Sequence, residues 1–446
     1  MASVIKKLIS CAAFGAFTLP LAGCSGVSFS VDTLLAAPKL TDEQTEIHEA
    51  LISAVGRNIT LKYPRNGNYR SAYVVYDFDG DNVDEALVFY EYSSAESEGI
   101  RANLLDRDED GEWYSVKEIA GAGTEVDQVI ISAMGKGNDA DVLVGYQGYT
   151  GDNTFEVYSY SDGSFDRLGS DSYSLLEAID INSDGTDEII AVQSTTDAET
   201  AAVSARAYLI ELDDGEIVKD DGIDMCTGVQ SYVKAYSGKL EDGSPAVYID
   251  ELNADGNLQT EIIFYRYSGL QNPVELRSNN LLSICTRPNG YSTADIDDDG
   301  VYEIPSTKAM TGYENAVSEE QILETTWYVY EDFYSFAEKF SGYCSVSEGY
   351  MMTFPSRWND EVTVKIDSET DEAVFYKYGG DINSDMTELM RIKTTTKEDA
   401  EQYIYDGYEL ITSKGQVQYL VKLPTNKRET LILTIDEVQN CFYTTD

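Results

Sequence analysis

Four short stretches of the sequence place acidic or amide side chains at the first, third, fifth and ninth positions of one pattern. In DINSDGTDEII, residues 180–190, these are Asp180, Asn182, Asp184 and Glu188, and apolar residues follow. Carboxylates this close repel one another unless a cation lies between them, and oxygens from alternate residues of a turn can converge on a hard ion such as Ca²⁺. The spacing predicts a calcium loop, although a single copy would equally fit an Asp- and Gly-rich turn that binds nothing.

The pattern recurs in the same register at three other places. The predicted ligands of these copies are Asp77, Asp79, Asp81 and Glu85; Asn253, Asp255, Asn257 and Glu261; and Asp295, Asp297, Asp299 and Glu303. Four matching copies make chance a poor explanation. The third copy carries two asparagines and should bind most weakly. A fifth copy at 133–144 keeps Asp141 at the ninth position but has Ala133 and Gly135 at the first and third, so we expect it to have lost its ion and kept its fold.

Other acidic stretches are interpreted differently. Asp106, Asp108 and Asp110 lead directly into strand residues and are predicted to form a hairpin turn, and 381–389 lacks the glycine and has Leu389 at its ninth position. An EF-hand needs a bidentate acid at the twelfth position and a following helix. The twelfth positions of the four copies are not acidic, which excludes that class; they are Val88, Ala191, Phe264 and Ser306.

The segments around the loops indicate a mainly β fold. From about residue 60, short runs rich in Tyr, Val and Ile alternate with turns of Asp, Gly, Ser and Asn, which is typical of all-β proteins. The copies begin at 77, 133, 180, 253 and 295, a spacing that suggests propeller blades with variable outer loops. Strand, Asp-Gly turn, strand patterns at 104–119, 155–169 and 207–219 would supply outer strands.

These loops resemble the FG-GAP or VCBS repeats of integrin-like β-propellers and bacterial surface proteins. The resemblance covers about residues 60–335 and rests on the Asp/Asn/Glu loops and the strands after them, while the Phe-Gly and Gly-Ala-Pro elements are missing. It implies an FG-GAP/VCBS-type β-propeller of about five to six blades, some degenerate, at residues 59–338. It also implies that the Ca²⁺ is structural and that each loop joins two strands of a blade.

The N-terminus has the parts of an export signal. Lys6 and Lys7 precede a short apolar run that ends in LAGC at residues 21–24, an order typical of a signal peptide. The tetrad resembles the lipobox of bacterial lipoproteins, which implies removal of residues 1–23, a lipid on Cys24, and anchoring to the outside of the bacterial cell membrane. A linker at 24–40 and an amphipathic helix at 41–58, opened by a capping box of Thr41 and Gln44, should follow. Residues 339–446 are expected to form a small α+β C-terminal domain.

Composition and motifs narrow the functional classes. A formal charge of −49 excludes general electrostatic attraction to nucleic acid. His48 is the only histidine and lies on the predicted helix, so Ser-His-Asp or Cys-His catalysis is not expected. Apart from Cys11 in the predicted signal peptide and Cys24 at the predicted lipid site, four cysteines remain. Cys226–Cys285 and Cys344–Cys441 are possible disulfides, and free thiols fit equally well.

The sequence therefore predicts a lipid-anchored extracellular binding or interaction protein, for adhesion or ligand capture, with structural calcium and no catalysis. Its partners would be the membrane, through the anchor, and an unknown surface protein or carbohydrate. The 33 tyrosines could supply stacking surfaces, although tyrosine also suits half-exposed strands. Two alternatives remain: a cell-envelope polysaccharide lyase or hydrolase, and a structural or assembly lipoprotein without a small ligand.

Overall fold

The structure is a computed structural model, and the chain divides into two compact units, Met1–Glu46 and Ile47–Asp446. It describes residues 40–93, 99–135, 139–148, 151, 153–197, 199, 203–273, 284–317, 320–331, 333, 335–425 and 428–445. The predicted signal peptide at 1–23 and the predicted lipid site at Cys24 lie outside these residues. Within them, no helix has the length and apolar character needed to cross a membrane.

The predicted N-terminal helix is present as α2, Asp42–Val55. The Thr41 hydroxyl accepts the Gln44 N–H, and the Gln44 side-chain oxygen accepts the Thr41 N–H, each at 3.1 Å. This is the predicted capping box. Ile47 and Leu51 form the buried stripe of the helix. His48 is packed beside that stripe, where its Nδ1 shares a 2.8 Å hydrogen bond with the hydroxyl of Tyr73.

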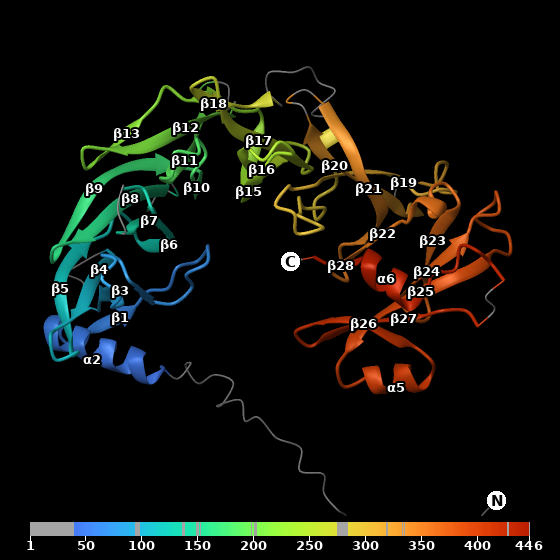
Figure 1. Ribbon diagram of the computed structural model, residues 1–446, viewed down its shortest axis with the longest axis horizontal. Coiled ribbons are helices and arrows are strands. Elements are labelled where there is room, and N and C mark those ends of the chain that lie inside the picture. Colours follow the sequence, from blue (N-terminus) through green and yellow to red (C-terminus); the bar gives the residue numbers. More distant parts are fainter. Residues whose placement is uncertain are drawn as a thin grey trace, which may run out of the picture. The chain divides into compact units, whose positions relative to one another are not determined.

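Most of the remaining described chain forms antiparallel sheets of strands that follow one another in sequence (Figure 1). The first sheet contains β1 Ile59–Leu61, β2 Tyr73–Tyr76, β3 Glu85–Tyr92, β4 Arg101–Arg107 and β5 Trp113–Ala120. The second contains β6 Glu125–Ser132, β7 Asp141–Gln147, β8 Asn153–Ser161 and β9 Ser164–Tyr173. The third contains β10 Leu175–Ile179, β11 Glu188–Thr196, β12 Val203–Asp213, β13 Glu216–Lys219 and β14 Ile223–Asp224. The fourth contains β15 Val229–Lys239, β16 Pro245–Asn253, β17 Leu258–Arg266 and β18 Gly269–Gln271.

Two further sheets complete the described chain. The fifth has the order β19-β20-β21-β22-β28, and the sixth β23-β24-β25-β27-β26. Their strands are β19 Ile304–Ala309, β20 Leu323–Glu331, β21 Ser335–Ser345, β22 Tyr350–Thr353, β28 Phe442–Thr444, β23 Val362–Asp367, β24 Glu372–Lys377, β25 Thr387–Thr396, β26 Glu409–Lys414 and β27 Val417–Lys422. The helical segments of this region are the 3₁₀ turn η2 Ser356–Trp358, α5 Ala400–Tyr405 and α6 Ile435–Cys441. Strand β21 runs through the boundary expected at 338–339.

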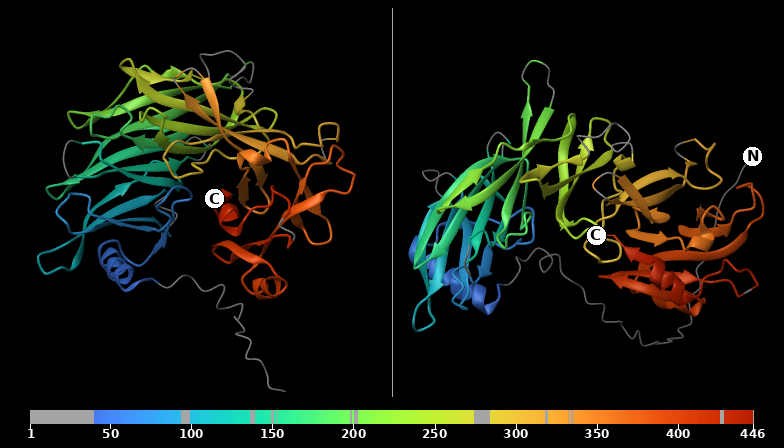
Figure 2. Two further views of the ribbon diagram at one scale, coloured as in Figure 1. Left: turned by 45° about the vertical axis from the view of Figure 1, so that its right-hand side comes forward. Right: turned by 45° about the horizontal axis from the view of Figure 1, so that its top comes forward.

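Much of the core lies between successive sheets. Because successive side chains of a strand point to opposite faces of its sheet, neighbouring residues of one strand pack against different sheets. On β7, Val142 and Val144 pack with the first sheet, whereas Leu143 packs with the third. On β11, Ile189 packs with the second sheet and Ile190 with the fourth. The central strands are therefore apolar on both faces, as expected for strands covered on both sides. Figure 2 shows the hairpins of these sheets from two further directions.

The fold is thus mainly β with several antiparallel sheets, as the sequence predicts. The three predicted hairpins form as β4–β5, β8–β9 and β12–β13. Neither possible disulfide forms between the four described cysteines, Cys226, Cys285, Cys344 and Cys441.

Candidate cation-binding loops

Three of the four predicted loops share one strand-to-strand connection. In each, the ninth-position glutamate pairs with the residue just before the loop, so eight residues lie between the two paired positions. The closing pairs are Tyr76–Glu85, Ile179–Glu188 and Ala294–Glu303. We call these segments loop one (77–85), loop two (180–188) and loop four (295–303). In each, the acid at the ninth position opens or directly precedes the next strand.

The first-position aspartate closes each turn by accepting two backbone N–H groups. In loop one, the two carboxylate oxygens of Asp77 accept the N–H of Asp81 at 3.1 Å and that of Asn82 at 2.9 Å. The equivalent distances are both 3.0 Å at Asp180 and 3.0 and 2.8 Å at Asp295. An aspartate accepting nearby backbone N–H groups is the usual way in which this side chain stabilises a tight turn.

The ninth-position glutamates are buried and hold the start of the loop. Glu85, Glu188 and Glu303 are at most 2% exposed. One oxygen of each accepts the N–H of the loop's second residue, at 2.7, 3.1 and 2.7 Å respectively. The side chain of that second residue is also buried, and these anchors are Phe78, Ile181 and Ile296. The acid is therefore both a potential ligand and part of the core.

The backbone explains the residue types at two further positions. The fourth and sixth residues of all three loops have positive φ, from 55° to 95°, the left-handed region that favours Gly and Asn. Gly80, Gly185 and Gly300 each fill one of these positions, and Asn82 fills the sixth position of loop one. The glycine that recurs in the three loops is thus required by the backbone conformation of the turn, whatever the loop binds.

Loop one brings four carboxylates together. Oxygen atoms of Asp77, Asp79, Asp81 and Glu85 lie within 4.8 Å of one another. Burial raises the pKa of Glu85 to about 8, and the neighbouring charges of Asp79, Asp106 and Asp77 add to this, while the Phe78 N–H opposes it. Asp106 belongs to the β4–β5 hairpin that the sequence predicts, so a second segment adds negative charge around the loop. Such a cluster favours a cation.

Loop two is less acidic because its third position is an amide. Asp180, Asp184 and Glu188 converge within the same limit of 4.8 Å. The Asn182 amide donates to Glu188 at 2.9 Å. Burial, with added charge from Asp184 and Asp180, raises the pKa of Glu188 to about 7.

Loop four is occupied by a lysine. Asp295, Asp297 and Asp299 converge as in the other loops, but the ammonium of Lys339 lies 3.0 Å from Asp297, 2.7 Å from Asp299 and 2.7 Å from Glu303. Burial disfavours the charged form of Lys339, yet its hydrogen bonds to Asp299, Glu303 and Asp297 outweigh this and raise its pKa.

The third copy does not form the same loop. β16 and β17 pair as far as Leu252 with Leu258, so residues 253–257 make a short hairpin turn. The Asn253 side chain accepts the N–H of Asp255 and of Asn257, while Glu261 lies inside β17, opposite Ile249. The structure therefore does not bring Glu261 together with Asn253, Asp255 and Asn257. The expectation that this copy shares the turn of the others was wrong, because β16 extends through the position where the other loops begin.

The degenerate fifth copy keeps the connection. Asp141 opens β7, is buried, and pairs with Ser132 across an eight-residue segment whose described residues are 133–135 and 139–140. Burial raises its pKa to about 6. Asp187 of loop two donates its N–H to the Ala133 carbonyl and accepts the Ala133 N–H, so neighbouring connections are hydrogen-bonded to each other. The acidic stretch predicted to form a hairpin turn does so, and Asp108 closes the β4–β5 hairpin. In the stretch 381–389, the ninth residue, Leu389, is buried within β25.

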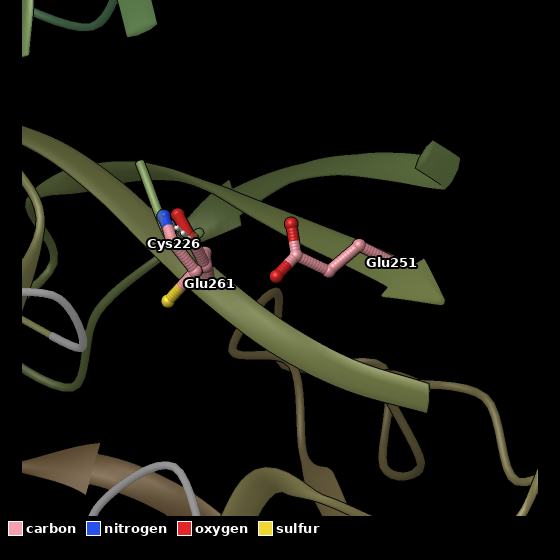
Figure 3. A group of neighbouring side chains, drawn as sticks. All are labelled: Cys226, Glu251 and Glu261. Carbon is pink, nitrogen blue, oxygen red and sulfur yellow. Dashed lines mark hydrogen bonds between the residues drawn. The ribbon is translucent and has the colours of Figure 1, made fainter. Parts of the chain in front are cut away.

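A second kind of cluster lies at the fourth sheet, and of its members only Glu261 belongs to the sequence pattern. Figure 3 shows the side chains of Cys226, Glu251 and Glu261, whose ligand-type atoms lie within 4.8 Å of one another and are all buried. The two oxygens of Glu261 accept the Cys226 N–H and the Asn272 amide, and Glu251 accepts the Gln259 amide. One thiol with two carboxylates is a donor set that suits a transition metal. Only the fold reveals it, because Cys226 lies between β14 and β15, Glu251 on β16 and Glu261 on β17.

The unit Ile47–Asp446 also contains a hollow of about 2020 Å³. Strands β6, β10 and β15 contribute residues to its wall, and amide side chains such as Asn66, Gln128 and Gln147 line it. Several tyrosines also line it: Tyr69, Tyr173, Tyr232, Tyr236, Tyr291, Tyr302 and Tyr443. Flat aromatic rings beside amides are surfaces on which carbohydrate or peptide groups can stack and form hydrogen bonds.

No protein-family model matches the chain, and no curated protein matches it. Among solved structures it is similar to a putative 6-phosphogluconolactonase from Bacteroides fragilis, with 9% identity over 74% of this chain and 93% of that one, at a TM-score of 0.31. It is also similar to a periplasmic gluconolactonase from Pseudomonas aeruginosa, with 11% identity over 68% of this chain and 81% of that one, at a TM-score of 0.30. The rhamnogalacturonan lyase YesW shares 11% identity with the chain over 74% of this chain and 76% of that one, at a TM-score of 0.31. Similarity at this level assigns neither a family nor an activity to the chain.

Proposed function

We propose that the chain is a calcium-stabilised binding or interaction protein. Its sheets would be arranged as FG-GAP/VCBS-type propeller blades, and a lipid at Cys24 would anchor the protein outside the cell. The observation that carries the calcium part is the shared turn of loops one and two, each of which gathers at least three carboxylates before a central strand. A divalent cation would remove the repulsion among them. In loop one the ligands would be Asp77, Asp79, Asp81 and Glu85. In loop two they would be Asp180, Asn182, Asp184 and Glu188.

Calcium would act on stability, with no part in chemistry. At free calcium of ten to a hundred times Kd, each site adds about 1.4–2.7 kcal/mol to the free energy of unfolding. The test is calorimetry of the purified chain in chelator and in millimolar calcium. We expect a higher Tm in calcium, and a smaller increase when Asp77→Asn and Asp180→Asn are combined. An unchanged Tm would defeat the calcium proposal.

The binding role is supported by the hollow lined with tyrosines and amides, and the ligand class that fits it best is carbohydrate. A glycan array with the calcium-loaded protein tests this. Tyr236→Ala removes a half-buried aromatic ring on β15 and should weaken any binding signal. A parallel screen for cleavage of envelope and plant polysaccharides addresses the enzyme alternative. Turnover of any polymer would replace the binding role with that of a lyase or hydrolase. No binding on the array would favour the structural alternative.

A further inference from the structure

The ammonium of Lys339 lies in loop four among the carboxylates that would coordinate a calcium ion. Its ammonium has three N–H donors, and three carboxylates of the loop accept them: Asp297, Asp299 and Glu303, at 2.7 to 3.0 Å. These are the third, fifth and ninth positions of the pattern. The ammonium is therefore fully hydrogen-bonded by oxygens that a divalent ion would also need. The Lys339 side chain is only 19% exposed and that of Glu303 is fully buried.

A β-bulge aims this lysine into the loop. On β21, Glu338 pairs with Tyr328 and Phe340 pairs with Trp327, so Lys339 is the extra residue between them. Tyr328 in turn pairs with Ile304, the residue directly after Glu303. An extra residue in one strand redirects its side chain. The bulge therefore faces the end of β19 at which loop four closes.

The first sheet has the same bulge with a different residue. On β5, Ser115 pairs with Leu105 and Lys117 with Leu104, which leaves Val116 as the extra residue. Leu105 pairs with Ala86, the residue directly after Glu85. Counted from the ninth-position glutamate, Val116 stands at loop one where Lys339 stands at loop four. Val116 is apolar and packs against the cluster that contains Phe78, so it brings no charge to loop one. Among the described residues, no ion pair reaches the four carboxylates of loop one.

We propose that Lys339 is the resident cation of loop four and that this loop binds no divalent metal. The sequence pattern predicts calcium there, but the residues present do not fit it, because the ammonium and a metal ion would compete for the same oxygens. Loop four is then held in a calcium-independent way, while loops one and two depend on the metal. The proposal rests on the proposed function only for that contrast.

The experiment measures the number of calcium ions bound per chain by calorimetric titration, and the Tm in chelator and in calcium. In the wild-type chain, Asp297→Asn combined with Asp299→Asn should leave the number of bound ions unchanged. Lys339→Met keeps the aliphatic stem and removes the ammonium. It should lower the Tm in chelator, bind one more calcium than the wild type, and recover its Tm in calcium. Lys308→Met is the matched control, because Lys308 pairs with Glu324 in the same sheet, 3.1 Å away, and does not contact loop four. It should gain no ion.

The reciprocal variant Val116→Lys should lose one calcium, because its ammonium would reach loop one. Fewer ions after the two loop-four substitutions, or no additional ion in Lys339→Met, would overturn the proposal, and Val116→Lys decides the matter if Lys339→Met does not fold. Failure of the proposed function has a different signature. In that case the wild type binds no calcium at loops one and two, while a calcium site gained in Lys339→Met would still be measured.

Discussion

The buried glutamate at the ninth position has two tasks, which a single substitution can separate. Glu85 accepts the N–H of Phe78 at 2.7 Å and is also one of four carboxylates in loop one. A glutamine in its place has an oxygen that can still accept this N–H, but it carries no charge. An alanine leaves a buried N–H without its acceptor, which typically costs about 1–3 kcal/mol.

We therefore expect Glu85→Gln to be at least as stable as the wild type in chelator at neutral pH, because it removes the cost of burying a carboxyl group that is ionised in the unfolded chain. It should lose the part of the calcium-induced increase in Tm that belongs to loop one. Glu85→Ala should be less stable with and without calcium. Thermal unfolding of both variants in the two buffers measures this. A full calcium response in Glu85→Gln would show that Glu85 is not a ligand.

At the scale of elements, the sequence indicates where the strand after loops one and two begins, because a continuous apolar run follows Glu85 and Glu188. It fails at the third copy. The letters N-x-D-x-N fit the pattern, but β16 is paired through Leu252, and the length of a pairing strand depends on its partner. Lys339 was missed for a similar reason. It lies on a strand two positions across the sheet from loop four, and only the register of β19, β20 and β21 brings it there.

The third copy gives a prediction at this scale. Asn253 stabilises a hairpin turn through the N–H groups of Asp255 and Asn257, at 3.0 and 3.1 Å. Asn253→Ala should lower stability by about 1 kcal/mol, and by the same amount in chelator and in calcium. Asp180→Ala, at the first position of loop two, should instead cost more in calcium than in chelator. Denaturant unfolding in both buffers compares the two, and a calcium-dependent cost at Asn253 would contradict the hairpin assignment.

At the scale of the whole molecule, the second and third sheets share a plan, because β7 and β11 are apolar on both faces and each is covered by the sheets before and after it. On the first sheet, one face of β3 is covered by helix α2 instead, where Ala86 and Val88 pack with Ile47. Ile189 and Ile190, adjacent on β11, contact different sheets. A sequence shows that such a strand is buried, but it does not show which sheet covers each face. The mainly β class and the hairpins could thus be predicted, whereas the packing partners could not.

The last prediction concerns how the whole molecule is held in place. The LAGC tetrad at residues 21–24 follows a short apolar run, and an acyl chain contributes about 0.8 kcal/mol for each buried methylene, so more than one chain is needed for stable anchoring. Cys24→Ala should move the protein from the membrane fraction to the soluble fraction of the producing bacterium, with its calcium response unchanged. Cys11→Ala is the matched control, because Cys11 lies within the predicted signal peptide at 1–23, and this variant should stay with the membrane. If Cys24→Ala fractionates like the wild type after a carbonate wash, the protein is held by something other than a lipid on Cys24.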